Sequence, residues 1–229
     1  MAQFHFVEDY ERLVAQLVAT YPLDEAMSLA VGGLFEEVGL RELNIVRYAG
    51  LRDGMSIIDL GCGSGRLAAA LGRAMKISYL GIDIVPQLLE YAKSKSPPSY
   101  VFMLNHALKI PVASCTADMV VAFSLFTHLL HAESYIYLEE MRRVLKPGGQ
   151  AVFSFLEFAA PGHWQVFADT VNAQRADSAP HLNMFIERGA ISVWAEKLGF
   201  EARQFVGATE APWGGAPLGQ SVAILQNPS

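Results

Sequence analysis

A glycine-rich turn between a strand and a helix constrains the fold of this chain more than any other feature. Residues 57–71 have the sequence IIDLGCGSGRLAAAL, in which an apolar run meets Gly61, Gly63 and Gly65 before an alanine- and leucine-rich helical stretch. Free backbone N–H groups at the start of a helix that follows a strand are typical of nucleotide sites. We therefore expect a sheet that carries a ligand at its strand ends.

The rest of the sequence repeats this alternation of strand and helix. Short runs rich in β-branched and aromatic residues, each followed by a turn or a helical pattern, predict parallel strands joined by helices; they are MSIIDL, ISYLGID, SYVFML, ADMVVAFSL and QAVFSFLEF. The strands EARQFV and QSVAIL come last with no helix between them, which predicts an antiparallel pair. Helical patterns cover residues 7–21, 24–49 with an interruption at Gly32-Gly33, 64–75, 86–96, 134–145 and 191–198.

Length and composition favour one domain in a reducing compartment. The chain has 229 residues, of which 17% are charged, against roughly 25% in an average domain. The net charge of −6 and the lack of a Lys/Arg cluster argue against a nucleic-acid partner. We find no signal peptide, membrane span or metal-ligand spacing, and Cys62 and Cys115 give no disulfide framework, so a cytoplasmic location is expected. The low charge and the apolar C-terminal stretch favour a homodimer.

The predicted domain spans residues 1–229 and has four parts. Residues 1–50 would form an N-terminal helical cap, residues 51–157 a ligand-binding core, and residues 189–229 a helix followed by the strand pair. Residues 158–188 match neither the helical nor the strand period, and we interpret them as an insertion that forms a lid over the sheet.

The spacing of the glycines distinguishes between two classes of ligand. A dinucleotide fingerprint requires a third glycine for close helix–strand packing, and Arg66 occupies that position. S-adenosylmethionine has no pyrophosphate and fits better. Asp59 would face its ammonium, and Asp83, at the end of the next strand, would accept from the ribose hydroxyls, with the apolar Ile84 against adenine. The structural alternative is a tight turn in which Asp59 caps the helix.

Four successive motifs resemble those of class I S-adenosylmethionine-dependent methyltransferases. They are IIDLGCGSGRL, YLGIDIVPQLLEYAK, ADMVVAFSLFTHL and EEMRRVLKPGGQAVFSF, and the resemblance extends over about residues 51–155. The resemblance implies a Rossmann-like α/β fold, with a doubly wound seven-stranded sheet in the order 3-2-1-4-5-7-6 and an antiparallel last strand. It also implies that Asp59, Gly61, Gly63 and Gly65 surround the methionine end and that Asp83 holds the ribose.

One position departs from the family pattern. Family members usually have an acidic residue after the third strand that contacts the adenine amino group, whereas this chain has Asn105 and His106 there. Either side chain could accept from that amino group. The predicted cofactor-binding set is therefore Asp59, Gly61, Cys62, Gly63, Gly65, Asp83, Ile84, Asn105, His106 and Phe123. For Cys62 the alternative is a small residue that fills space in the turn.

His128 is the candidate general base, because it follows the fourth strand and imidazole titrates near neutral pH. The alternative is a capping or packing residue, and His131 is either its partner or an exposed side chain. Predicted acceptor-binding residues are Glu157, at the end of the fifth strand, and His163, Trp164 and His181 in the lid segment. For each lid residue, ordinary surface packing is the alternative.

Together these features predict methyl transfer from S-adenosylmethionine to a small molecule, with S-adenosylhomocysteine as the product. We favour O-methylation of a hydroxylated metabolite or sugar. The alternatives are N-methylation of a small amine, a catalytically silent S-adenosylmethionine-binding module, and a nicotinamide-dependent oxidoreductase, which Arg66 opposes.

Overall fold

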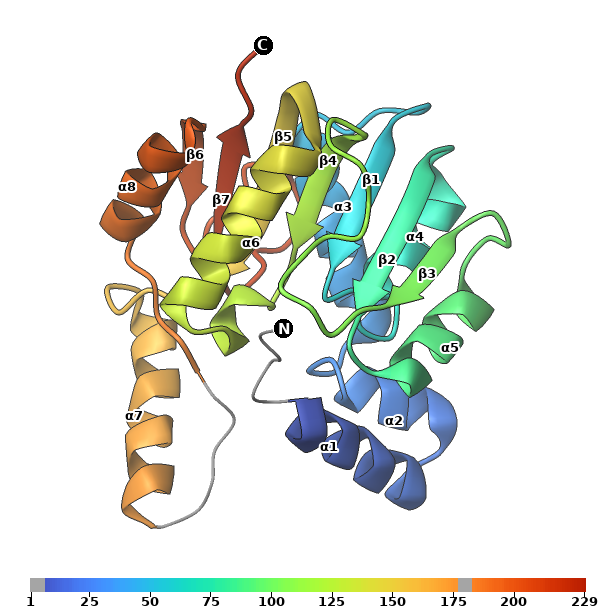
Figure 1. Ribbon diagram of the computed structural model, residues 1–229. Helices are drawn as coiled ribbons and strands as arrows, with labels where there is room; N and C mark the ends of the chain where they lie inside the picture. Colours follow the sequence, from blue (N-terminus) through green and yellow to red (C-terminus); the bar gives the residue numbers. More distant parts are fainter. Residues whose placement is uncertain (1–6, 177–182) are drawn as a thin grey trace.

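The chain folds around one seven-stranded sheet in the order β3-β2-β1-β4-β5-β7-β6 (Figure 1). The computed structural model of the protein describes residues 7–176 and 183–229. β7 alone runs antiparallel to its neighbours, as its pairing with β5 and β6 shows. The strands are β1 Ser56–Leu60, β2 Ser78–Asp83, β3 Val101–Leu104, β4 Ala117–Ala122, β5 Leu145–Phe155, β6 Glu201–Val206 and β7 Ser221–Gln226. The predicted strands, their order and the antiparallel final strand are confirmed.

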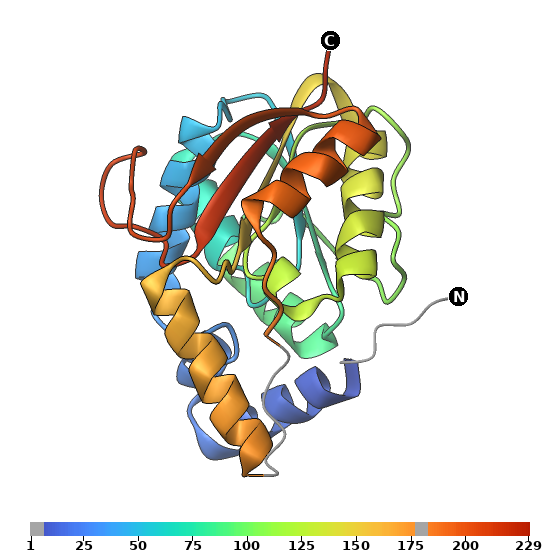
Figure 2. The ribbon, with the colours of Figure 1, turned by 90° about the vertical axis from the view of Figure 1, so that its left-hand side faces the viewer.

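Helices cover both faces of the sheet (Figure 2). They are α1 Val7–Thr20, α2 Leu23–Leu29, α3 Phe35–Tyr48, α4 Arg66–Ala74, α5 Pro86–Lys95, the 3-10 turn η1 Phe126–His128, α6 His131–Val144, α7 Pro161–Arg175 and α8 Arg188–Leu198. Side chains of α3 and α4 share one apolar core with the sheet, and those of α6 and α8 share another. None of these helices combines the length and apolar character needed to cross a membrane within the described residues.

The N-terminal helices differ in how they join the fold. α3 packs closely on α4, since a side-chain carbon added at Gly39 would lie 2.5 Å from the Arg66 carbonyl oxygen. The predicted break in this region is present: Gly32 and Gly33 have φ of +87° and +79° and separate α2 from α3. α1 and α2 lie instead below the carboxyl ends of the parallel strands (Figure 1).

The segment from residue 158 to 188 contains a helix that its sequence pattern did not predict. α7 is 15 residues long, and His163 is its one buried residue, so it lacks the apolar stripe by which helices are recognised. It projects away from the sheet (Figure 2). The chain then returns alongside the core, where Met184 N–H donates to the Thr127 carbonyl and Ile186 N–H to the Leu156 carbonyl, at 2.8 Å each.

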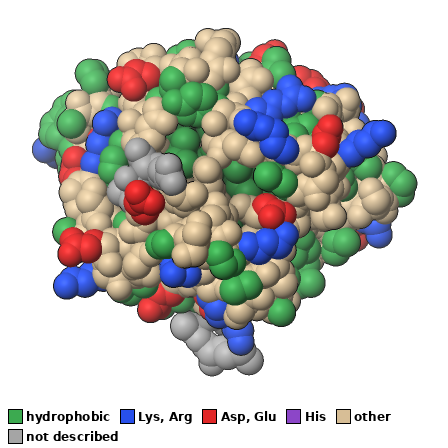
Figure 3. Space-filling model, turned by 90° about the horizontal axis from the view of Figure 1, so that it is seen from above, with side chains coloured by type: hydrophobic (Ala, Val, Ile, Leu, Met, Phe, Trp, Pro, Cys, Tyr) green, Lys and Arg blue, Asp and Glu red, His purple; other side chains and the backbone are tan. Residues whose placement is uncertain are grey.

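The surface carries no large area of one charge on the face seen from above in Figure 1. Figure 3 shows lysine and arginine side chains interspersed with acidic and apolar ones there. This mixture agrees with the modest net charge of −6.

Candidate active site

A cavity of about 390 Å³ opens at the carboxyl ends of β1, β2 and β4. Its size lies in the range of small-ligand sites, about 300–1,000 Å³. The glycine turn after β1, the end of β2 and the segment after β4 form one side of it, while α1 and the end of α2 contribute residues from the opposite side. The parallel sheet thus places its ligand site where open α/β sheets generally bind ligands.

The glycines of the turn have two different roles. Gly61, Gly63 and Gly65 all have positive φ, of +69°, +54° and +84°, a conformation that other residues rarely adopt. Gly61 and Gly63 line the cavity. Gly65 does not: a side-chain carbon there would lie 2.6 Å from the Cβ of Ala92, so Gly65 allows α4 and α5 to approach closely. Of the three predicted glycines, the structure thus places Gly61 and Gly63 in the cavity wall and Gly65 at the contact between α4 and α5.

Asp83 connects the glycine turn to the end of β2. Its Oδ2 accepts from Gly63 N–H at 2.8 Å, and its Oδ1 accepts from Ile84 and Val85 N–H at 2.8 and 3.0 Å. Burial raises the pKa of Asp83, and these three hydrogen bonds oppose the rise. A carboxylate offers about four acceptor positions, so one position on Oδ2 remains for a hydroxyl in the cavity.

Asp59 lies at the end of β1 and is almost fully buried in the cavity wall. The Tyr79 hydroxyl donates to its Oδ2 at 2.6 Å. Burial raises the pKa of Asp59 to about 8; the Tyr79 hydrogen bond and Arg66 oppose the shift, while Glu42 and Asp83 add to it. A cation placed beside this buried group would favour its ionised form.

Arg66 forms an ion pair with another acid, Glu42. Its Nε lies 2.8 Å from Oε1 of Glu42 on α3, and its Nη1 donates to the Val31 carbonyl at 2.6 Å. Both charged side chains line the cavity. Sequence reasoning missed Glu42, although an acid on the helix face that also carries Gly39 and Leu43 was a readable signal of a buried ion pair.

Cys62 and Ile84 also line the cavity. Cys62 is buried, and a side-chain carbon added at Gly81 of β2 would lie 2.9 Å from its Sγ. Cys62 therefore fills the space beside Gly81, in line with the space-filling alternative. Ile84 is half-buried and presents an apolar surface at the end of β2.

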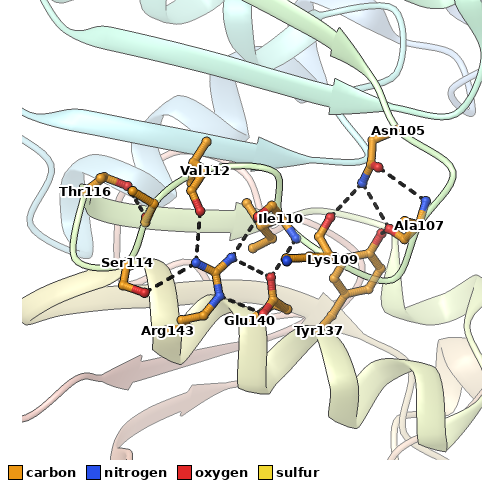
Figure 4. Close-up of polar contacts among 11 residues, drawn as sticks. Asn105, Ala107, Lys109, Ile110, Val112, Ser114, Thr116, Tyr137, Glu140 and Arg143 are labelled. Carbon is orange, nitrogen blue, oxygen red and sulfur yellow. Dashed lines mark hydrogen bonds and ion pairs between the residues drawn. The ribbon is translucent and has the colours of Figure 1, made fainter. Parts of the chain in front are cut away.

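The segment between β3 and β4 is held in shape by its own hydrogen bonds (Figure 4). The Asn105 amide donates to the carbonyls of Ala107 and Lys109 at 3.0 and 2.7 Å, and its oxygen accepts from Ala107 N–H at 3.3 Å. Asn105 lines the cavity. His106 does not, and its Nε2 lies 2.9 Å from the Ile84 carbonyl oxygen. Of the two predicted adenine contacts, the structure places only Asn105 in the wall.

Two residues of α6 fix the remainder of that segment (Figure 4). Arg143 donates to the carbonyls of Ile110 and Val112 at 2.7 and 2.9 Å, and Glu140 accepts from Ile110 N–H at 2.8 Å. Hydrogen bonds between Glu140 and Arg143 hold both side chains in place. The cavity wall beside Asn105 is therefore rigidly supported from α6.

His128 lies at the end of η1 and lines the cavity, as does Phe123 at the end of β4. The ring of Tyr10, from α1, meets the His128 ring edge-on at a centroid distance of 5.9 Å. Sequence analysis did not identify Tyr10, Tyr137 or Gln220, which also line the cavity. Their positions depend on tertiary packing between distant segments.

His131 and the predicted acceptor-binding residues lie elsewhere. His131 is exposed, and its Nε2 lies 2.9 Å from the Phe185 carbonyl oxygen. Glu157 forms an ion pair with Arg188 at 2.7 Å and accepts a hydrogen bond from Ser221. Burial alone would raise the pKa of Glu157, but these partners hold it below its ordinary value.

The lid residues are likewise absent from the cavity wall. His163 is buried, with Nδ1 3.0 Å from the Glu157 nitrogen and Nε2 3.1 Å from the Gly219 carbonyl oxygen. Trp164 is exposed and packs on Phe158 and Phe167. His181 lies outside the described residues. The structure therefore places Glu157, His163 and Trp164 outside the wall of this cavity, in contact with other parts of the fold.

Comparison with known proteins gives the family of this core. Residues 58–153, which contain the glycine turn, Asp83 and His128, match the family described as methyltransferase domain. By sequence, this region is therefore a methyltransferase domain. The match covers the strands and turns that form most of the cavity wall, whereas α1 and α2 lie outside it.

Two curated relatives are similar to this chain over part of their length. The chain is 32% identical to the demethylmenaquinone methyltransferase of Staphylococcus aureus over 124 residues, 52% of this chain and 50% of that protein. It is 28% identical to the biotin biosynthesis bifunctional protein BioHC of Cellvibrio japonicus over 181 residues, 79% of this chain and 34% of that protein. The chain thus spans half or less of the length of these relatives.

Solved structures share the fold at low sequence identity. The magnesium protoporphyrin IX methyltransferase of Synechocystis PCC 6803, solved with bound S-adenosylhomocysteine, is 16% identical, with a TM-score of 0.66 over 98% of this chain and 96% of that one. A Thermotoga maritima protein described as a possible histamine N-methyltransferase is 18% identical, with a TM-score of 0.65 over 97% and 99%. These likenesses establish the fold.

Proposed function

We propose that this protein transfers a methyl group from S-adenosylmethionine to a small-molecule acceptor. The observation that carries the proposal is that one cavity is lined by the glycine turn, by the acids at the ends of β1 and β2, and by His128. The family of residues 58–153 supports the cofactor, and the names of the curated relatives support a small acceptor.

The donor set of the cavity fits this cofactor. Gly61 and Gly63 leave room for the amino-acid end, Asp59 offers its ammonium a buried carboxyl group, and the remaining position on Asp83 can accept a ribose hydroxyl. When bound, the cofactor supplies a methyl group made electrophilic by a positively charged sulfur. Ile84 and Asn105 extend the wall where adenine would lie.

His128 would handle the proton in this reaction. A ring nitrogen of its imidazole would accept the proton that an acceptor hydroxyl loses as it is methylated, which is the role of a general base. The cavity walls would align the acceptor, and such alignment contributes about 10⁵–10⁸ M in effective concentration in favourable cases. We favour a hydroxylated metabolite or sugar as acceptor, with a small amine as the second choice.

Calorimetric titration with S-adenosylhomocysteine tests the cofactor, with NAD as the parallel control. We expect micromolar binding of the first and none of the second, because Arg66 fills the position of the third glycine of a dinucleotide site. Binding of NAD alone, or of neither ligand, would contradict the proposal. Binding of S-adenosylhomocysteine without methylation of any hydroxyl or amine in an acceptor panel would favour a silent binding module.

His128→Ala tests the general base once an acceptor is known. We expect turnover to fall by about 10²–10⁴-fold, the usual contribution of a positioned base, while affinity for S-adenosylhomocysteine changes little. His131→Ala is the matched control, since this neighbouring histidine contacts the Phe185 carbonyl outside the cavity. Equal turnover in the His128 variant and the wild type would remove this residue from the mechanism.

A further inference from the structure

Tyr10 is an aromatic residue in the cavity that the family match does not cover. It lies on α1, outside residues 58–153, and lines the cavity together with Leu13 of the same helix. α1 lies below the carboxyl ends of the strands (Figure 1). The ring meets His128 at 5.9 Å with an interplanar angle of 67°. On one side, the Tyr10 ring therefore borders His128, beside which the methyl acceptor is proposed to bind.

On its other side, Tyr10 lies near the charged groups of the proposed cofactor site, Asp83 and Arg66. Burial raises the pKa of Tyr10, the Asp83 carboxylate raises it further, and the Arg66 guanidinium opposes the rise. The phenol is thus within electrostatic range of both charged groups of the glycine-turn region. Apolar packing keeps α1 in this place, because Val14 is fully buried in a cluster with Met27 of α2 and Leu88 of α5.

We propose that the Tyr10 ring forms an aromatic wall against the sulfonium of S-adenosylmethionine and discriminates this charged donor from the neutral thioether of S-adenosylhomocysteine. The inference rests on the proposed function. The sulfur joins the amino-acid end, assigned to the glycine turn, to the ribose, assigned to Asp83, and its methyl group must face the acceptor beside His128. Tyr10 borders these same regions, and the face of an aromatic ring attracts cations.

The charge around the cavity strengthens this assignment. Asp59, Asp83 and Glu42 are three buried acids of the cavity wall. Among the described residues that line the cavity, Arg66 is the one arginine or lysine, and it is paired with Glu42. The wall therefore favours a ligand that brings positive charge. S-adenosylmethionine carries one more positive charge than S-adenosylhomocysteine, and that extra charge is the sulfonium.

The test compares the dissociation constants of both ligands, measured by calorimetry without any acceptor. The variants are Tyr10→Leu and Tyr10→Met, which remove the ring, and Tyr10→Phe, which keeps it. We expect the ratio of the S-adenosylhomocysteine to the S-adenosylmethionine dissociation constant to fall about tenfold in Tyr10→Leu and Tyr10→Met, as the loss of a desolvated cation–π contact predicts. Tyr10→Phe should stay within about twofold of the wild-type ratio, because its ring face is intact.

Leu13→Ala is the matched control, because it alters the same helix and the same cavity without removing a ring. It should weaken both ligands alike and leave their ratio unchanged. A Tyr10→Leu or Tyr10→Met protein that weakens both ligands equally would overturn the role of the ring while leaving the proposed function intact. Failure of the wild type to bind either ligand would overturn both.

Discussion

Asp83 and Glu157 occupy similar places in the chain but have different roles in the molecule. Asp83 is the last residue of β2, and Glu157 lies two residues beyond β5, so both are buried acids at the carboxyl edge of the sheet. Asp83 receives three backbone N–H groups and lines the cavity. Glu157 is matched by the Arg188 guanidinium and lies outside the cavity.

The difference concerns whether the protein itself supplies the neutralising charge. Arg188 and Ser221 satisfy Glu157, and its pKa is held below the ordinary value. Burial raises the pKa of Asp83 and of Asp59, and the nearby Arg66 is paired with Glu42. At the ends of β1 and β2, the carboxyl groups of Asp59 and Asp83 can therefore be stabilised in their ionised form by a cationic ligand. At the end of β5, Arg188 already supplies the positive charge beside Glu157. Position at a strand end selects candidates, and the local partners decide their roles.

The largest expected contrast is in the pH dependence of stability, tested with Asp59→Asn. The carboxyl group of Asp59 has a raised pKa, of about 8, in the folded protein, so its contribution is fully present below the unfolded pKa near 4 and is lost as the pH rises towards 8. Relative to the variant, the wild type should lose stability by at most about 1.4 kcal/mol per pH unit over this window. Urea denaturation of both proteins at pH 5, 6, 7 and 8 measures it.

If the free energy of unfolding changed with pH equally in the two proteins, Asp59 would be ionised throughout this range. The protein itself would then stabilise the charge of Asp59 without a ligand. A matched variant is Glu157→Gln, in which the sign is reversed. Glu157 has a lowered pKa, so its contribution is present above its unfolded pKa and is lost as the pH falls through the folded value.

Asp83→Asn should have the next largest effect, on ligand affinity. The substitution removes the negative charge and replaces one acceptor oxygen by a donor amide that would face backbone N–H groups. Loss of a charge-assisted hydrogen bond costs about 1.5–3 kcal/mol, so S-adenosylhomocysteine should bind about 10- to 100-fold more weakly. Calorimetry gives the affinity, and unchanged binding would place the ribose elsewhere.

Glu157→Gln should lower the stability of the protein but leave its affinity for S-adenosylhomocysteine nearly unchanged. Without the carboxylate, Arg188 and Ser221 lose their charged partner, and we expect a loss of about 1–2 kcal/mol in the free energy of unfolding at pH 7. Affinity for S-adenosylhomocysteine should stay within about twofold of wild type, since the side chain is outside the cavity. A loss of affinity as large as that of Asp83→Asn would remove the distinction between the two edges.

The site residues at the ends of β1 and β2 could be predicted because the local sequence pattern of strand, turn and helix determines their positions. The glycines at positive φ and the acid at the end of the next strand follow directly from the strand–turn–helix sequence. Chain order and the absence of a helix before QSVAIL likewise predict the antiparallel strand. The seven-stranded order came from the motif resemblance, and the structure has that order.

The opposite side of the cavity could not be predicted in this way. Tyr10 reaches it only because α1 packs on α2 and α5, and Gln220 only because the chain returns before β7. α7 has one buried residue and so gives no amphipathic signal. Glu157 and His163 have sequence positions suited to a site, but Arg188 and the Gly219 carbonyl bind them from distant segments.

Asn105→Ala gives the smallest expected effect and tests how far the cavity wall extends beyond β2. The amide of Asn105 fixes the carbonyls of Ala107 and Lys109, so its removal should loosen the wall and weaken S-adenosylhomocysteine binding by about three- to tenfold, about the value of one ordinary hydrogen bond. Thr116→Val is the control, because the Thr116 hydroxyl, at the far end of the same segment, donates to the Ala113 carbonyl. Equal affinities in the two variants would mean that the adenine does not contact this wall, and that ligand recognition ends at Asp83 and Ile84.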